Sequence, residues 1–111
     1  MGYYANFEVE ITGFKDKEEL DLFEFKRIYK SGKFYKEYFR VNGDEITAYL
    51  DSFKWYEWEK DILQLLEGYP HLTCIIHGER EEYPDIWKAK IKDGKCQKVK
   101  AEITFPPFDE V

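Results

Sequence analysis

The chain has 111 residues, of which 23 are Asp or Glu and 17 are Lys or Arg, and its formal net charge is −6. This length is typical of one domain, spanning residues 1–111, that builds a single core without metal or disulfide staples. Nine Tyr, nine Phe and three Trp exclude an intrinsically disordered chain, because such chains are poor in aromatic residues. The negative charge disfavours nonspecific binding to nucleic acid and favours a basic partner.

The first ten residues, MGYYANFEVE, contain neither a basic region nor a long apolar segment, so they do not resemble a secretory signal. The apolar runs of the chain are far shorter than the ~20 residues of a membrane-spanning helix. We therefore expect a cytoplasmic protein that does not enter a membrane. In that compartment Cys74 and Cys96 are expected to be reduced and packed as small hydrophobic side chains.

Residues 3–12 alternate between two sets of side chains, one apolar and one largely polar, which predicts a half-buried strand. Asp16 and Glu19 have the spacing of a capping box and predict a helix over residues 17–30 that ends near Gly32. The stretch FEFKRIY within this range also alternates as a strand would. The apolar stripe expected on the helix comprises Leu20, Leu22, Phe23, Phe25 and Tyr29.

Residues 34–51 predict a β-hairpin, because Asn42-Gly43 is favoured at a two-residue type I′ turn. This turn also fixes the register of the two strands. The expected cross-strand pairs are Val41 with Asp44, Arg40 with Glu45, Phe39 with Ile46, Glu37 with Ala48, and Tyr35 with Leu50. Apolar residues at three- and four-residue spacing then predict a second helix over residues 55–67.

Residues 72–78 predict a short apolar strand, and residues 87–105 predict a second hairpin around Asp93-Gly94. A two-residue loop would mix the two faces of this hairpin, so we predict a longer loop with a bulge at Gly94. Its core face would then carry Trp87, Ala89, Ile91, Val99, Ala101 and Ile103. The order of elements predicts an α+β fold, namely a ferredoxin-like β-α-β-β-α-β antiparallel sheet with two helices on one face and an added C-terminal β-hairpin.

His71, Cys74 and His77 resemble a run of metal ligands, but strand geometry argues against a shared site. The two histidines would lie about 20 Å apart along a strand, and the cysteine would point to the opposite face. The sequence contains no Gly-rich phosphate loop and no known nucleophile motif. We therefore expect no metal, no cofactor and no enzymatic activity.

Charge divides the second half of the chain. Residues 41–86 hold eleven acidic and three basic side chains, and this part ends in the stretch GEREEYPDIW over residues 78–87. The stretch fits a solvated connection between strands, a protein-docking surface, or an acid/base or hard-metal site. The candidate partner-binding residues are Tyr56, Glu79, Glu81, Glu82, Tyr83 and Asp85.

Residues 87–100 instead hold six lysines and one acid. In the predicted register one face of the terminal hairpin carries Lys88, Lys90, Lys92, Lys98 and Lys100. Such a face either binds phosphate or an acidic partner, or is a solvated face that protects an edge strand from aggregation. Recognition of RNA by stacking on strand aromatics is disfavoured, because lysines hold the outward positions. Exposed tyrosines, namely Tyr4, Tyr38 and Tyr49, could instead support a homodimer through the sheet face.

About residues 54–95 contain the layout WY…D…YP…GE…DIW…DGK. This layout resembles that of small proteins carried by phages and plasmids, and the stretch is similar to the ferredoxin-like domain of the plasmid YubB/Api92-like group. The resemblance implies an accessory protein of a phage or other mobile element, and it transfers no catalytic residue. Small acidic proteins of such origin include inhibitors of host nucleases, such as anti-CRISPR proteins.

Charge and resemblance together predict a non-enzymatic binding protein that docks its acidic surface on a basic protein. A host defence nuclease is the most concrete candidate partner, because carboxylates can occupy positions that phosphates take in a nucleic-acid channel. The alternative is an accessory protein that binds nucleic acid through the lysine face.

Overall fold

The structure is a computed structural model of the chain, and it describes residues 5–30, 38–80 and 86–100. These residues form an α+β fold with one six-stranded antiparallel sheet and two helices. The strands are β1 (Ala5–Thr12), β2 (Phe39–Asn42), β3 (Glu45–Phe53), β4 (Thr73–Arg80), β5 (Ile86–Lys92) and β6 (Lys95–Lys100). The helices are α1 (Lys17–Phe23), which continues as the π-helix η1 (Glu24–Tyr29), and α2 (Trp58–Leu65).

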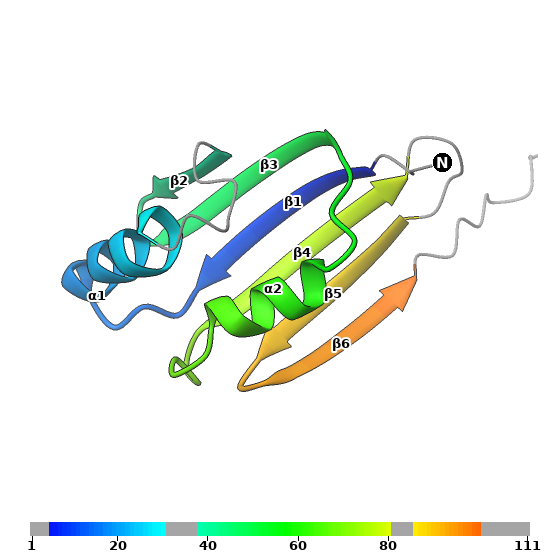
Figure 1. Ribbon diagram of the computed structural model, residues 1–111. Coiled ribbons are helices and arrows are strands. Elements are labelled where there is room, and N and C mark those ends of the chain that lie inside the picture. The colour runs from blue at the N-terminus through cyan, green and yellow to red at the C-terminus, as the bar shows by residue number, and fades with distance from the viewer. Residues whose placement is uncertain (1–4, 31–37, 81–85, 101–111) are drawn as a thin grey trace, which may run out of the picture.

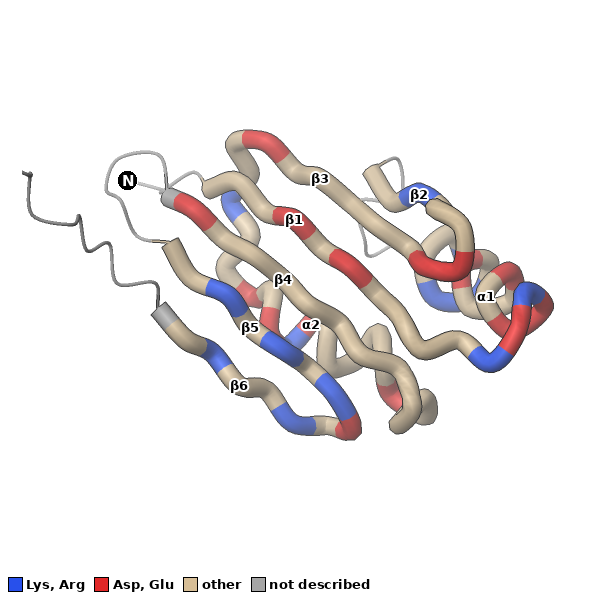
Figure 2. Tube along the Cα trace, turned by 180° about the vertical axis from the view of Figure 1, so that it is seen from behind, with Lys and Arg blue, Asp and Glu red and all other residues tan. Residues whose placement is uncertain are grey.

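The strands lie in the order β2-β3-β1-β4-β5-β6, and every neighbouring pair is antiparallel. The first four of these strands are compatible with a ferredoxin-like arrangement. Both helices lie on one face of the sheet (Figure 1). The opposite face carries no helix of the described residues and is called the open face below (Figure 2).

Strand β1 lies inside the sheet, and its alternating sequence explains the core. Phe7, Val9 and Ile11 are at most 3% exposed on the face that the helices cover. Glu8 and Glu10 alternate with them and are exposed on the open face. The strand predicted over residues 3–12 is thus confirmed from Ala5 onwards, with the predicted parity.

The helix over residues 17–30 is confirmed, but its apolar stripe is narrower than predicted. Leu20 and Phe23 are buried, as predicted. The remaining three residues of the predicted stripe, Leu22, Phe25 and Tyr29, are between 44% and 59% exposed. Leu22 is already exposed within α1. Beyond α1 the helix widens into η1, in which the Lys30 N–H donates to the Phe25 carbonyl oxygen at 2.9 Å. This wider turn carries Ile28, rather than Tyr29, into the core.

The first hairpin forms, but the predicted register is wrong. The observed pairs are Phe39 with Ala48, Arg40 with Thr47, Val41 with Ile46, and Asn42 with Glu45. The two-residue turn is therefore Gly43-Asp44, one position later than predicted. Gly43 has a φ of +66° at the first turn position, which is the preference of a type II′ turn. The predicted positions of Tyr35 and Glu37 lie outside the described residues.

A bulge interrupts β3 near its end. Ala5 pairs with Phe53, whereas Phe7 already pairs with Leu50, so β3 holds one extra residue over this interval. Ser52 within the bulge has a φ of +58°, and its N–H donates to Asn6 Oδ1 at 2.9 Å. The bulge redirects the chain before it enters α2.

The second hairpin also forms with a register that differs from the prediction. Lys92 pairs with Lys95, so Asp93-Gly94 is a two-residue turn, and its φ angles of +51° and +72° fit type I′. The intrinsic preference of Asp-Gly for this turn outweighs the apolar pattern of β6. Val99 is consequently 65% exposed on the open face instead of buried. Ala101 and Ile103 lie outside the described residues.

Candidate functional site

The acidic stretch that follows Gly78 is described only in part. Glu79 is exposed at the end of β4. The other four predicted docking residues of this stretch, Glu81, Glu82, Tyr83 and Asp85, lie outside the described residues. Their docking role stays a prediction.

The structure brings the two separate parts of the predicted docking set to one end of the sheet. Ala5 pairs with Phe53 on one side and with Arg80 on the other, so β1 begins where β3 and β4 end. Tyr56 is 66% exposed and follows Phe53 by three residues, so it lies near the end of the sheet where β4 carries Glu79. We call this region the acidic end and define it by the exposed residues Asp51, Tyr56, Glu57 and Glu79.

The five predicted lysines do not share one face, and this prediction is wrong. Lys88, Lys90 and Lys92 alternate with the buried side of β5 and are exposed on the open face. Lys98 pairs with Ala89, a core residue, and so lies on the face that the helices cover. Lys100 pairs with Trp87, which places its strand position on that same side. The two-residue turn is the reason, because it shifts the parity of β6 by one residue relative to the prediction.

Lys98 has a specific place on the helix side. Its Nζ lies 5.0 Å from the ring centroid of Trp87 and 5.7 Å from that of Trp58. The two indoles are stacked, with ring centroids 4.4 Å apart. The lysine therefore forms a cation–π contact with a stacked pair of tryptophans on the helix side, away from the lysines of β5 on the open face.

The open face separates its charges by strand (Figure 2). Exposed acidic residues lie on β1, exposed lysines lie on β5, and β4 lies between these strands. A depression of about 460 Å³ lies over the acidic side of this face. The residues that line it include Glu8, Glu10, Tyr38, Arg40, Tyr49 and His77. Glu8 and Glu10 were not among the predicted site residues, although their even positions in an alternating strand indicated their exposure.

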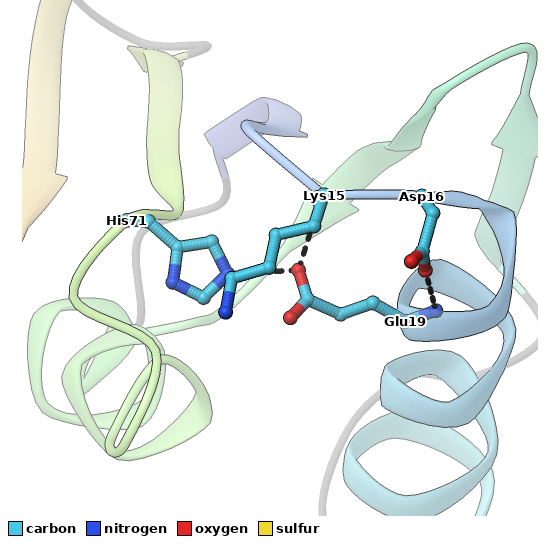
Figure 3. A network of polar contacts seen from close by, with 4 residues as sticks. All are labelled: Lys15, Asp16, Glu19 and His71. Carbon is cyan, nitrogen blue, oxygen red and sulfur yellow. Dashed lines mark hydrogen bonds and ion pairs between the residues drawn. The ribbon is translucent and has the colours of Figure 1, made fainter.

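His71 belongs to a structural network on the other side of the fold (Figure 3). Its Nε2 lies 2.8 Å from Oε1 of Glu19, which also accepts the Lys15 N–H at 3.0 Å. The Glu19 N–H in turn donates to Asp16 Oδ1 at 2.8 Å, which caps α1 as the capping-box spacing predicted. The hydrogen bond from the Lys15 backbone, followed by that from His71, holds the pKa of Glu19 below its ordinary value of 4.5.

The candidate metal ligands diverge in the structure. His71 points to Glu19, Cys74 is buried in the core, and His77 lines the depression on the open face. Within residues 5–30, 38–80 and 86–100, no group of three or more His, Cys, Asp or Glu side chains is placed to hold a metal ion.

Both cysteines are free thiols on the core face of the sheet, Cys74 on β4 and Cys96 on β6, with β5 between them. Ile91 separates them, because it pairs with Cys74 on one side and with Cys96 on the other. Burial raises the pKa of the Cys74 thiol far above its ordinary value of 9.0. Burial, together with a hydrogen bond to Glu59, raises the pKa of Cys96 to about 11. Both thiols are therefore protonated and poorly nucleophilic at neutral pH, as expected of packed cysteines.

Among the helices in the described part of the chain, none has the length and apolar character needed to span a bilayer. The predicted resemblance of residues 54–95 to small phage and plasmid proteins stays a prediction. Comparison of the chain with protein-family models, with curated proteins and with solved structures finds no match.

Proposed function

We propose that this chain is a non-enzymatic binding protein that docks its acidic end on a basic protein surface. The observation that carries the proposal is the pairing of Ala5 with both Phe53 and Arg80. This pairing brings exposed carboxylates from two distant parts of the chain to one end of the sheet, where the connection that carries the exposed Tyr56 begins. Tyrosine is enriched at protein-recognition surfaces, and charged residues occur at their solvated rims, where they favour oppositely charged partners.

The fold supports this assignment through the place that it gives to the acidic end. We assign it as a ferredoxin-like domain with β5 and β6 added beyond β4, on the basis of the strand order and the two helices on one face. On that scaffold the acidic end is formed by strand termini and connections, which are the parts of a fold that most often carry binding. The resemblance to mobile-element proteins adds a candidate partner, namely a host defence nuclease with a basic nucleic-acid channel.

The binding test uses purified nucleases as defined partners. Inhibition of cleavage is measured as this protein is titrated into RNA-guided and restriction nucleases at low and at high salt. The double variant Asp51→Lys/Glu57→Lys and the single variant Tyr56→Ala are each expected to weaken inhibition at least about tenfold. The matched control is Glu18→Lys/Asp21→Lys, which makes the same charge change on α1 at the opposite end of β1.

A separate variant, Glu81→Lys/Glu82→Lys/Asp85→Lys, tests the docking role predicted for the acidic connection. The proposal is contradicted if the variants at Asp51, Glu57 and Tyr56 still inhibit the nuclease fully. It is also contradicted if these variants and the control variant on α1 lose inhibition to the same extent. The absence of inhibition at low salt across the nucleases tested would contradict it as well, because docking that depends on opposite charges is strongest there.

A nucleic-acid-binding role for the lysines of β5 is the alternative. Lys88, Lys90 and Lys92 are exposed together, which favours it. The neighbouring carboxylates of β1 oppose it, because they repel phosphate. An electrophoretic shift that disappears in Lys88→Gln/Lys90→Gln would establish this role instead.

A further inference from the structure

The open face carries two charged stripes of opposite sign (Figure 2). Glu8 and Glu10 on β1 form the acidic stripe, and Lys88 and Lys90 on β5 form the basic stripe. Strands are about 4.8 Å apart, so stripes that are two strands apart are separated by about 10 Å at the backbone. Within the described part of the chain, no ion pair involves any of these four residues. Each stripe therefore faces outward without an internal counter-charge.

The register aligns the stripes in two rows across β4. In one row Glu8 and Lys88 are the direct neighbours of His77, one on each side. In the next row Glu10 and Lys90 flank Ile75 in the same way. The two sides of the open face thus match in position about β4 and are opposite in charge.

This arrangement is self-complementary. A two-fold rotation about an axis parallel to β4 exchanges the two sides of the sheet and leaves each row at its own height. We propose that the open face binds a second copy of this chain in this way and forms a homodimer. Glu8 then lies opposite Lys88 of the second copy and Glu10 opposite Lys90, and each pair occurs twice because the interface is isologous. Ile75 and His77 lie on the axis and meet their own copies.

The outer strands of the same face supply the apolar contacts. Tyr49 on β3 is the neighbour of Glu8, and Val99 on β6 is the neighbour of Lys88. These side chains are 54% and 65% exposed, so both offer apolar surface on the open face. The proposed rotation places Tyr49 of one copy over Val99 of the other, so both become buried.

The shape of the face fits this packing. The depression of about 460 Å³ lies between Tyr49, the acidic stripe and Lys88, so the lysines of the second copy can enter it. Face-to-face sheets pack about 10 Å apart, which long Glu and Lys side chains span together. The contact covers about 500 Å² per copy for five strands of this length, or on the order of 1,000 Å² in total. This area lies at the low end for specific interfaces, so the dimer depends on protein concentration and on salt.

Other partners fit this face less well. Nucleic acid would meet the carboxylates of β1 beside the lysines of β5. A different protein would need stripes of both signs at the matching spacing, which a second copy provides by symmetry. The stripes that carry this inference contain no residue of the acidic end. The two surfaces adjoin at Glu79 on β4, whereas Tyr56 and Glu57 lie on the chain that leads to α2.

The first test measures molecular mass by analytical ultracentrifugation of the full chain. The wild type is expected to dimerise at low salt and to dissociate as salt rises. Glu8→Lys/Glu10→Lys makes both stripes basic, and Lys88→Glu/Lys90→Glu makes both acidic, so each variant alone is expected to dimerise at least about tenfold more weakly. The control variant Glu18→Lys/Asp21→Lys carries the first charge change on α1 and is expected to dimerise as the wild type does.

The decisive measurement mixes the two stripe variants in equal amounts. A heterodimer then places the variant with two basic stripes against the variant with two acidic stripes, so opposite charges meet in every row. Dimerisation is therefore expected to return to about the wild-type level or above. Circular dichroism establishes that each variant is folded. A wild type that stays monomeric at low salt up to millimolar concentration, or variants that neither lose dimerisation alone nor regain it when mixed, would overturn the proposal.

A second test locates the axis without altering charge. Ile75→Cys is expected to crosslink between copies with a short bis-maleimide, because the two copies of residue 75 meet at the axis. Thr47→Cys lies two strands from β4, so its copies are about 20 Å apart or more and are not expected to crosslink. The same axis brings the two Glu79 carboxylates together at one end of β4, so Glu79→Gln is expected to strengthen the dimer. Crosslinking of residue 47 but not of residue 75 would contradict this axis.

Discussion

Gly78 and Trp87 face each other across β4 and β5, and the indole of Trp87 lies directly against the glycine Cα. A β-carbon at Gly78 would overlap Cε2 and Cζ2 of the ring. The glycine therefore creates the space in which Trp87 lies flat and stacks on Trp58.

Gly78→Ala is expected to lower the free energy of unfolding by about 1–3 kcal/mol, because the indole must leave its position in a packed core. Chemical denaturation gives the value. The control is a double-mutant cycle with Trp87→Leu, in which most of the penalty should vanish because the overlapping ring is gone. Additive effects of the two substitutions would show that Trp87 is not the cause.

Arg27 links η1 to the end of α2. Its Nη2 donates to the Glu67 carbonyl oxygen at 2.8 Å, and its guanidinium lies 5.3 Å from the ring centroid of Tyr69. Arg27→Ala is expected to cost about 1–2 kcal/mol in unfolding free energy, because it leaves a helix C-terminus without its cation and donor. Lys26→Ala, at an exposed neighbouring position, serves as the control and should change little. Equal effects of the two would exclude the proposed link.

Glu19 predicts a defined pH dependence of stability. Its pKa in the folded chain lies below the ordinary value of 4.5, so the charged carboxylate stabilises the fold at higher pH. This stabilisation is lost as the pH falls through the lowered folded-state pKa. Glu19→Gln should therefore lower the thermal midpoint at neutral pH, and the difference from the wild type should shrink progressively below pH 4.5. Glu18→Gln is the neighbouring control, and a difference that is constant with pH would contradict the assignment.

The cation–π contact of Lys98 is a testable part of the helix side. Lys98→Gln is expected to reduce stability by about 0.5–1 kcal/mol, because the ammonium lies over two indole rings. Tryptophan fluorescence should change with the same substitution. Lys95→Gln removes a lysine from the turn end of the same strand and should leave the emission unchanged.

Asn6 anchors the bulge in β3. Asn6→Ala removes the acceptor of the Ser52 N–H and is expected to cost about 1 kcal/mol. Hydrogen exchange should show faster exchange at Ser52 than in the wild type, while the amides at the centre of β3 keep their protection. Thr12→Ala, on the same strand at the opposite end, is the control. Unchanged exchange at Ser52 would show that the bond is not retained in solution.

The sequence predicts the elements well where one physical signal dominates. Alternation in residues 5–12 gives the strand and its buried side, and the spacing of Asp16 and Glu19 gives the start of α1. The registers of both hairpins are wrong, for different reasons. In the first hairpin a turn at Asn42-Gly43 and a turn at Gly43-Asp44 leave the same residues on the apolar face, so the apolar pattern cannot choose between the two registers. In the second hairpin turn chemistry and apolar pattern disagree. The first turn is formed by Gly43-Asp44 rather than by Asn42-Gly43. The second turn, at Asp93-Gly94, has two residues, and its register leaves Val99 exposed although the apolar pattern predicts its burial. No local sequence pattern predicts that the helix widens into the π-helix η1. In the structure this widening accompanies the burial of Ile28.

The candidate sites show a related limit. The parity of β1 indicates that Glu8 and Glu10 are exposed, but only the strand order places them two strands from Lys88 and Lys90. That order depends on pairing between distant segments, which no local pattern encodes. In the sequence, separate signals mark Tyr56 and Glu79, namely expected exposure and charge, and their common position follows only from the two partners of Ala5.

Strand β1 has a consequence for how the chain acquires its structure during synthesis. It is made before both of its partner strands, and one of its two hydrogen-bonded edges is completed only by β4, which ends at Arg80. A nascent chain therefore exposes an apolar strand with an unsatisfied edge until β4 has left the ribosome. Because β1 must wait for a distant partner strand, folding is expected to be slow. Until β4 pairs with it, the exposed edge of β1 is prone to aggregation.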